Sequence, residues 1–198
     1  MTVEQLPLFD DMLPVSWLFD PLERGAYNLI CADPPWTWNA WSDQGLKKSA
    51  QRHYSCMGLE DIKALPVAEL AAPDAILLLW ATTPMLPHAL ETMSAWGFSY
   101  KSHIIWRKTT ALGKVRMGCG YWARSMHELV LIGCRGKPRV FKPALPSIFN
   151  GLARAHSRKP DEFYQLIEVR SQGLRRADLF AREERPGFAA WGDETTIF

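Results

Sequence analysis

Cysteine is scarce in this chain, and its copies are far apart. The four cysteines among the 198 residues are Cys31, Cys56, Cys119 and Cys134, and no two of them form a C-x-x-C pair. Zinc ribbons and disulfide scaffolds depend on closely placed cysteine pairs or on a higher cysteine content. The pattern argues against both classes and is typical of a protein from a reducing cytoplasm, where we expect this one to lie.

Several other motifs are absent. No run of eighteen apolar residues occurs, and Glu4, Asp10 and Asp11 interrupt the N-terminal segment where a signal peptide would have its apolar core. The G-x-G-x-x-G fingerprint of dinucleotide-binding folds is missing, and no cluster of metal-ligating side chains is evident. We therefore expect a soluble protein that contacts no membrane and holds no metal.

An excess of one charge sign is also lacking, since 23 basic and 21 acidic side chains leave a net charge of +2. A polyanionic partner would have to bind a local basic patch. With 47% hydrophobic and 22% charged residues and no internal repeat, the chain is typical of one compact domain. We expect that domain to span 16–198, preceded by an extended N-terminal arm, 1–15.

The N-terminal arm contains an isolated apolar cluster, Gln5-Leu6-Pro7-Leu8-Phe9. Pro7 and Pro14 disfavour a regular helix or strand there. One interpretation is that the apolar side chains of the cluster pack on the domain. The other is that the cluster resembles the short peptide, a glutamine followed by leucines and a terminal phenylalanine, through which bacterial proteins dock on the DNA-replication sliding clamp.

Apolar runs bounded by turn residues alternate with segments of helical periodicity along most of the domain. The expected strands are 27–32, 75–80, 102–106, 128–132 and 177–181, with a short sixth at 188–191. The expected helices are 59–70 with a break at Pro66, 87–96 ended by Gly97, and 160–170 with Pro160 in its first turn. This alternation predicts an α/β fold with a mostly parallel sheet and helices on both faces.

The stretch after the first expected strand carries the most chemistry. Asp33-Pro34-Pro35-Trp36 ends an apolar run, and because neither proline can donate to a sheet ladder, the chain must leave the sheet there. Ligands bind at this carboxyl edge in open α/β sheets. One interpretation is a turn with a core tryptophan. The other is a grip for a planar, amine-bearing base, in which Asp33 and the Pro34 carbonyl accept two N–H groups and Trp36 stacks on the ring.

This tetrad resembles the signature of the MT-A70 family of N6-adenine methyltransferases, and further matches recur in order along nearly all of the chain after residue 20. The matching stretches are Arg52-His53-Tyr54-Ser55-Cys56-Met57, Leu78-Leu79-Trp80, Gly97-Phe98, Gly120-Tyr121-Trp122-Ala123-Arg124, His156-Ser157-Arg158-Lys159-Pro160-Asp161-Glu162, Leu179-Phe180-Ala181-Arg182 and Trp191-Gly192-Asp193-Glu194. The resemblance implies a Rossmann-like, S-adenosylmethionine-dependent methyltransferase fold in permuted order, with the catalytic motif before the cofactor strand. It gives the catalytic role to Asp33, Pro34, Pro35 and Trp36.

The same resemblance implies a binding site for S-adenosylmethionine. The candidate cofactor-binding residues are Asp33, His156, Ser157, Lys159, Phe180, Arg182, Gly192, Asp193 and Glu194. In this assignment Lys159 meets the carboxylate of the cofactor, and Asp33 contributes to binding its ammonium group. Two positions depart from the family pattern, since Asp193 stands where asparagine is common and Ala155 where glutamate is frequent. A carboxylate at 193 still accepts ribose hydroxyls but no longer donates.

Two stretches without clear periodicity, 38–51 and 108–124, interleave cations with aromatic residues. They are either solvated loops or a two-sided gate that holds nucleic-acid phosphates near the tetrad, and the aromatic content favours the gate. The candidate substrate-binding residues, some of them added by the resemblance, are His53, Tyr54, Lys108, Arg116, Trp122, Arg124 and Glu128. Tyr54 is equally compatible with a core phenol and Glu128 with a strand-edge charge, and nothing nearby in sequence would orient His53 as a general base.

Together these observations favour a cytoplasmic, adenine-specific DNA methyltransferase of bacterial or phage type, which rotates its target base out of the DNA stack. The compact size and the clamp-like peptide point to DNA. Two alternatives remain, namely the same chemistry on RNA or single strands, and a non-catalytic nucleic-acid-binding subunit, although such subunits typically lose the tetrad that this chain retains. Since eukaryotic members of the family work as pairs, we also expect a homodimer whose interface involves 108–124.

Overall fold

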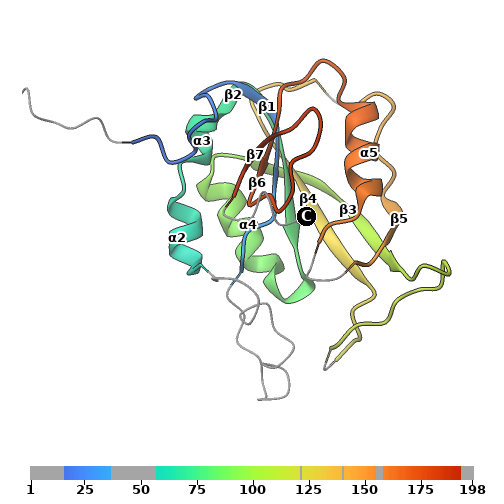
Figure 1. Cartoon of the computed structure of the whole chain (residues 1–198). Coiled ribbons are helices and arrows are strands. Elements are labelled where there is room, and N and C mark those ends of the chain that lie inside the picture. Colours follow the sequence, from blue (N-terminus) through green and yellow to red (C-terminus); the bar gives the residue numbers. More distant parts are fainter. Residues whose placement is uncertain (1–15, 37–56, 121, 140, 155–157, 193–198) are drawn as a thin grey trace, which may run out of the picture.

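The computed structural model describes residues 16–36, 57–120, 122–139, 141–154 and 158–192. Its centre is a seven-stranded sheet in the order β5-β3-β4-β2-β1-β6-β7 (Figure 1). The strands are β1 Tyr27–Ala32, β2 Ala71–Ala81, β3 Ser99–Thr109, β4 His127–Arg135, β5 Ile148–Leu152, β6 Arg176–Leu179 and β7 Ala189–Trp191. The helices are α2 Leu59–Ala64, α3 Val67–Leu70, α4 Leu86–Ala95 and α5 Asp161–Arg170, with a 3₁₀ turn, η2 Thr83–Met85, before α4.

The sheet is mostly parallel, as predicted, with one reversed strand. β4 runs antiparallel to its neighbours β2 and β3, and every other neighbouring pair is parallel. At one edge of the sheet, Ala32 at the end of β1 pairs with both Leu79 and Leu179, while Ala81 pairs with Leu129 near the start of β4. Side chains that begin β4 therefore lie at the edge where β1, β2 and β6 end.

Alternate side chains of the central strands point into two separate cores. Ile30 and Ala32 of β1 pack in the core that includes residues of α2, α3 and α4, whereas Leu29 and Cys31 pack in the core that includes α5. Figure 1 shows α5 on one face of the sheet and the other helices on the opposite face. A strand buried on both faces is an unbroken apolar run, which is why β1 could be predicted with its observed bounds.

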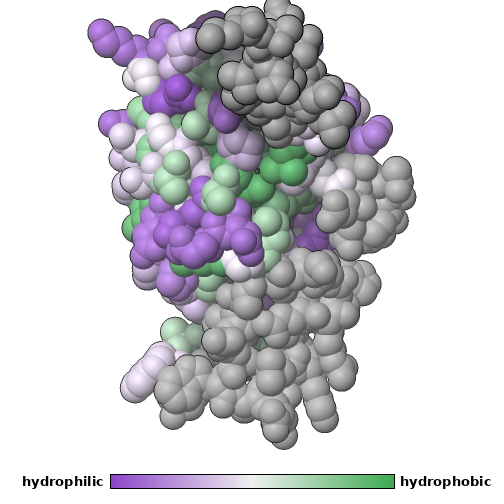
Figure 2. All heavy atoms as spheres, turned by 90° about the vertical axis from the view of Figure 1, so that its left-hand side faces the viewer, coloured by the Kyte–Doolittle hydropathy of each residue, from purple (hydrophilic) through white to green (hydrophobic). Residues whose placement is uncertain are grey.

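The outer faces of the helices are polar. Glu60 and Asp61 of α2 and Glu91 of α4 are exposed, whereas Ile62 and Met93 on the inner faces are buried. Figure 2 looks onto the side where α2 and α3 lie and shows hydrophilic side chains over much of its coloured surface. The apolar residues recur at helical spacing because each helix buries one face against the sheet.

The predicted helices are confirmed with small shifts at their ends. The break at Pro66 separates α2 from α3, and Pro66 caps the second of these helices. Gly97 follows α4 with a φ of +79°, a conformation that favours glycine. α5 begins at Asp161, so that Pro160 is the residue before the helix and not part of its first turn.

The strands differ from prediction in three ways. β2, β3 and β4 are longer than the predicted runs. β5 was not predicted, because an edge strand with Ile148 51% and Leu152 37% exposed gives no buried apolar run. β6 ends at Leu179, two residues earlier than predicted, because Phe180 has a left-handed φ of 61° and turns the chain out of the sheet.

Candidate active site

The fold places Asp33 directly after the carboxyl end of β1, a strand that lies between β2 and β6. The backbone N–H of Asp33 donates to the carbonyl of Leu179 at 3.3 Å, which ties it to the end of β6. The next two residues leave the sheet, and the N–H of Trp36 donates back to the Pro34 carbonyl at 2.8 Å. The prolines therefore turn the chain as predicted and hold the Asp33 carboxylate at the sheet edge.

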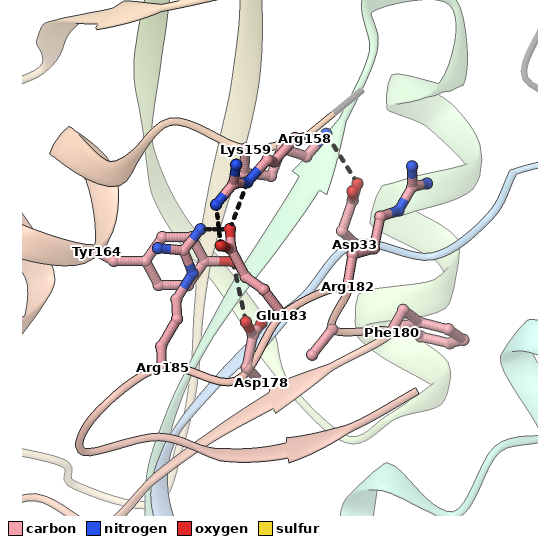
Figure 3. Close-up of a pocket in the computed structure, with 10 residues that line it drawn as sticks. Asp33, Arg158, Lys159, Tyr164, Asp178, Phe180, Arg182, Glu183 and Arg185 are labelled. Carbon is pink, nitrogen blue, oxygen red and sulfur yellow. Dashed lines mark hydrogen bonds and ion pairs between the residues drawn. The ribbon is translucent and has the colours of Figure 1, made fainter. Parts of the chain in front are cut away.

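Four charged side chains meet at this edge, and they come from separate elements. The ammonium of Lys159 lies 3.0 Å from Asp33 Oδ1 and 2.9 Å from Glu128 Oε2. The ammonium of Lys108 lies 2.6 Å from Glu128 Oε1. Lys159 and Glu128 are each only about a tenth exposed, which makes this a largely buried chain of alternating charges. Figure 3 shows the contact between Lys159 and Asp33 from the pocket side.

Burial and pairing act in opposite directions on these groups. Burial raises the pKa of Asp33, and the nearby Glu128 carboxylate adds to this, while Lys159 and Arg182 oppose it. Burial alone would also raise the pKa of Glu128, but Lys159 and Lys108 together outweigh it and lower that pKa to about 2. Burial would lower the pKa of Lys159, but its two carboxylate partners raise it. Glu128 and Lys159 are therefore the ionised framework of the cluster, and Asp33 is its carboxyl group whose pKa lies above the usual value.

Aromatic rings line the buried side of this cluster. The Lys159 ammonium lies 4.7 Å from the ring centroid of Trp80, and that of Lys108 lies 5.1 Å from the Trp106 ring. The two indoles pack edge to face with centroids 5.9 Å apart. Cation–π contacts of this kind offset part of the cost of removing ammonium groups from water.

Trp36 does not have the place expected for a base-stacking residue. Its side chain is 9% exposed and packs in the core that includes α2 and α4, and its indole N–H donates to the Trp80 carbonyl at 3.2 Å. The turn made by the prolines folds the ring back over the end of β2. The interpretation of Trp36 as a core tryptophan therefore fits the structure better than stacking on a target base, and the Pro34 carbonyl already accepts one N–H from Trp36.

A pocket lies between the start of α5 and the loop that follows β6. The residues that line it are Asp33, Arg158, Lys159, Tyr164, Asp178, Phe180, Ala181, Arg182, Glu183 and Arg185 (Figure 3). Four of the predicted site residues, namely Asp33, Lys159, Phe180 and Arg182, thus share one cavity. The left-handed backbone of Phe180 lets the chain turn immediately after the buried β6 and form the pocket wall.

Gly192 lies beside the same turn. A Cβ atom at this position would stand 2.5 Å from the Ala181 carbonyl oxygen, so only glycine fits without displacing the backbone. The N–H of Ala181 also donates to the Trp191 carbonyl at 3.0 Å. The end of β7 is thereby held against the segment that lines the pocket.

Other predicted substrate-binding residues lie away from this pocket. Lys108 joins the charged cluster through Glu128, but Arg116, Trp122 and Arg124 lie on the extension that connects β3 with β4 and projects beyond the sheet (Figure 1). Arg116 donates to the Ala153 carbonyl at 3.0 Å and Arg124 to the Gly118 carbonyl at 3.1 Å. Trp122 is 95% exposed. Within the described residues, the structure does not bring these three side chains to Asp33.

Several predictions fall on residues outside the described ranges. They concern the arm segment Gln5–Phe9, the stretch 38–51, and the single residues His53, Tyr54, His156, Ser157, Asp193 and Glu194. Among the described residues, no group of three or more His, Cys, Asp or Glu side chains could hold a metal ion. The same part of the chain contains no helix that is long and apolar enough to span a bilayer.

Sequence reasoning did not single out four of the ten residues that line the pocket. These four residues are Tyr164, Asp178, Glu183 and Arg185. Asp178 stands inside the predicted strand 177–181, and Glu183 and Arg185 follow that strand closely in the sequence. The Tyr164 hydroxyl donates to Asp178 Oδ2 at 3.0 Å. Burial raises the pKa of Asp178 to about 7, with Asp33 and Glu183 adding to the effect while Tyr164 and Arg185 oppose it. An acidic residue in the middle of an apolar strand was the available signal, because burying such a residue is costly without a partner.

Comparison with known proteins agrees with this architecture. The MT-A70 family model matches residues 27–194. The chain is 31% identical over 160 residues to a putative N(6)-adenosine-methyltransferase MT-A70-like protein of Medicago truncatula, which covers 80% of this chain and 24% of the relative. It is 28% identical over 196 residues to the human N(6)-adenosine-methyltransferase catalytic subunit METTL3, covering 93% of this chain and 32% of the relative.

A bacterial relative matches along most of its length. The type II methyltransferase M.MunI of Mycoplasma sp is 29% identical over 202 residues, covering 91% of this chain and 83% of the relative. By contrast, the chain spans only about a quarter to a third of the plant and human relatives. Because the family model extends from β1 to beyond β7, this chain belongs to the MT-A70 family.

Proposed function

We propose that this protein transfers a methyl group from S-adenosylmethionine to the N6 amine of adenine in DNA. The observation that carries the proposal is the shared pocket, in which Asp33 of the catalytic tetrad lies beside Lys159, Phe180 and Arg182. Had Asp33 been remote from Lys159 and Phe180, a methyl donor at the latter residues could not have met an amine at the former.

The lining of the pocket fits the chemistry of the cofactor. S-adenosylmethionine, when bound, supplies an activated methyl group on a positively charged sulfur. Two of the three N–H donors of Lys159 serve Asp33 and Glu128, and we assign the third to the carboxylate of the cofactor. Asp33 and the half-buried Phe180 offer an anion and an aromatic face to the ammonium and sulfonium groups.

Asp33 carries the central role in the reaction. Its carboxylate accepts an N–H of the adenine amine, and the remaining acceptor capacity of the Pro34 carbonyl takes the second. This favours a nitrogen with a localised lone pair. Bound S-adenosylmethionine would supply the methyl group and keep the electron pair of its C–S bond, and Asp33 would stabilise the positive charge that grows on the adenine nitrogen as the N–C bond forms. The proton then leaves to water.

The projecting connection between β3 and β4 is our candidate for nucleic-acid contact. It carries Arg116 and Arg124, and its Trp122 is exposed enough to stack on a base. The same connection also carries two exposed apolar side chains, Leu112 at 84% and Met117 at 53% exposure. A second copy of the chain could bury them, and so we also propose this connection as part of a homodimer interface. A duplex substrate must have its adenine rotated out of the stack, and phosphate contacts on such a surface would offset that cost.

DNA is favoured because M.MunI, a bacterial type II methyltransferase, matches this chain over most of its own length. RNA is the second candidate, because plant and animal relatives of comparable identity are described as N(6)-adenosine-methyltransferases. The coverage of those longer relatives is far lower, and so we rank RNA below DNA.

Methyl incorporation distinguishes the two substrates. The protein is incubated with radiolabelled S-adenosylmethionine and equal nucleotide amounts of duplex DNA, single-stranded DNA and transcript, and the products are digested to nucleosides. We expect N6-methyldeoxyadenosine, with duplex DNA the best substrate. A higher yield of N6-methyladenosine from the transcript would favour the second candidate, and no incorporation together with no heat of cofactor binding would refute methyl transfer.

A further inference from the structure

We propose that Glu183 is a positioning residue, which holds the segment carrying Lys159 in place for cofactor binding. This inference rests on the proposed function. It concerns a residue that neither the tetrad nor the predicted cofactor site includes, and whose carboxylate accepts hydrogen bonds from two arginine side chains.

The contacts of Glu183 join two segments on opposite sides of the pocket. Its carboxylate accepts from Arg158 Nε at 2.9 Å and also from Arg158 Nη2, a two-pronged contact that fixes both groups. It further accepts from Nη2 of Arg185. The side chains of Glu183 and Arg185 are each 13% exposed, so water screens this pair far less than a surface pair.

Arg185 extends the connection to the start of α5. Its Nη1 lies 2.8 Å from Asp161 Oδ1, and Asp161 also pairs with Arg154. The guanidinium of Arg185 lies 3.8 Å from the ring centroid of Tyr164, one turn further into the helix. The loop after β6 is therefore tied to α5 by charge pairs and by stacking.

The position of Lys159 follows from these two connections. Lys159 lies in the chain between Arg158, which Glu183 holds, and Asp161, which Arg185 holds. Figure 3 shows Arg158 and Arg185 converging on Glu183 beside Lys159. The backbone of Lys159 is thus fixed on both sides, and its ammonium can reach Asp33 and Glu128 together. Glu183 thus acts on the cofactor site through Lys159, without touching the reacting atoms.

Removing the Glu183 charge has a specific consequence. Two guanidinium groups would then face a neutral side chain and repel each other in a poorly solvated site. The Lys159 segment would relax away from the loop, and the pocket would lose its preformed shape. At saturating cofactor the chemical step would change less than the affinity, because bound cofactor would return Lys159 to its place beside Asp33, and the Asp33 backbone stays tied to the end of β6.

The test compares Glu183→Gln with Glu23→Gln in the full chain. Glu23 makes a similar two-pronged contact with Arg175, at 3.0 and 3.1 Å, but both partners are more than half exposed. We measure the dissociation constant for S-adenosylmethionine by calorimetry, and kcat and both KM values with DNA. For Glu183→Gln we expect cofactor affinity to fall at least about tenfold, as for a broken buried pair. Its kcat and its KM for DNA should stay within about threefold, and Glu23→Gln should match the wild type.

Four results bear on the inference. Glu183→Asp should recover part of the lost affinity, because it restores the charge on a shorter arm, and unchanged cofactor affinity in Glu183→Gln overturns the positioning role alone. A wild-type protein that binds no cofactor overturns both this inference and the proposed function. If Glu183→Gln does not fold, Arg158→Gln replaces it, because this variant cuts the same connection while Glu183 keeps Arg185. It must show the same affinity loss, and wild-type affinity in Arg158→Gln overturns the positioning role.

Discussion

The Lys159 ammonium lies 3.0 Å from the Asp33 carboxylate, so that the cofactor-binding cation and the catalytic acid of our proposal form one ion pair. Residues in direct contact do not act independently, and substitutions of these two should be non-additive. Cofactor affinity and turnover are therefore expected to be coupled at this site through the charge on Lys159.

Asp33→Asn should reduce kcat by at least about 100-fold, the size of effect seen when a group that stabilises transition-state charge is removed. The amide keeps the shape of the carboxylate and one acceptor but has no charge to offer the nitrogen. Cofactor affinity should be weakened or unchanged. Single-turnover methyl transfer measures the chemical step directly. The control is Asp74→Asn, because Asp74 is exposed and lies near the start of β2, far from the carboxyl ends of β1, β2 and β6. An Asp33→Asn protein with wild-type turnover would end the proposed mechanism.

Lys159→Met should destabilise the protein by about 3–5 kcal/mol, as expected when one partner of a buried pair is removed and its carboxylates remain. The pKa of Asp33 should rise further, because Lys159 is the main group that opposes its burial. Urea unfolding at pH 7 measures the first effect, and the pH dependence of kcat the second.

The matched control is Lys63→Met. Lys63 also lies between two carboxylates, Glu60 at 2.9 Å and Glu91 at 3.8 Å, but both acids are more than half exposed. We expect its loss to change the free energy of unfolding by less than about 1 kcal/mol. Equal effects of the two substitutions would mean that burial does not strengthen the Lys159 pairs.

Asp178→Asn should alter how stability depends on pH. The pKa of Asp178 is about 7 in the folded protein and near 3.8 in the unfolded chain, so between these values only the folded form keeps the proton. Its contribution to stability is complete below about pH 4 and is lost as pH rises through 7, at up to about 1.4 kcal/mol per pH unit. The asparagine can still accept from Tyr164 and has no charge to bury.

Denaturant unfolding at pH 4.5, 6 and 7.5 measures this effect. The stability of Asp178→Asn relative to wild type should increase across the series. Asp74→Asn again serves as the control, since it removes an exposed carboxylate. A difference that stays constant with pH would show that Asp178 is ionised throughout the range.

Gly151→Ala should lower both stability and cofactor affinity. An added Cβ would stand 2.7 Å from Pro160 Cβ and 2.7 Å from Trp106 Nε1, and that indole N–H donates to the Gly151 carbonyl at 2.9 Å. Overpacking of this kind costs about 1–3 kcal/mol. Because Pro160 follows Lys159, its displacement should also weaken cofactor binding.

Thermal melting and calorimetry test the Gly151→Ala prediction. Asn150→Ala is the neighbouring control, because the Asn150 side chain is exposed and accepts a long hydrogen bond, 3.4 Å, from Arg107. If the melting temperature and the cofactor affinity of Gly151→Ala equal those of the wild type, the contact between residue 151 and Pro160 does not influence the position of Lys159.

Local sequence signals predicted those parts of the fold that depend on neighbouring residues. The run 27–32 and the prolines after it were enough to place a buried strand and its exit, because proline cannot continue a sheet ladder. Pro66 and Gly97 likewise marked helix ends. The place of Asp33 at the sheet edge followed from these signals.

Contacts between distant segments were harder to predict. The reversal of β4 brings Glu128 to Lys159, and nothing in the apolar pattern of a strand reveals its direction. Trp36 folds into the core because of the turn geometry, whereas its residue type was equally suited to stacking. The commitment of Glu183 to two arginines depends on the left-handed turn at Phe180, a conformation uncommon outside glycine.

The antiparallel return of β4 beside β3 has a consequence for how this protein can vary. Trp106 is paired with Glu128 in the sheet, and Lys108, two residues beyond Trp106, contacts the same glutamate, so a single hairpin contains both members of this ion pair. Insertions or deletions at the hairpin tip leave that pair intact. The tip, which we proposed as the nucleic-acid contact, can therefore vary in sequence and length, while the base of the hairpin preserves the charge balance next to Asp33.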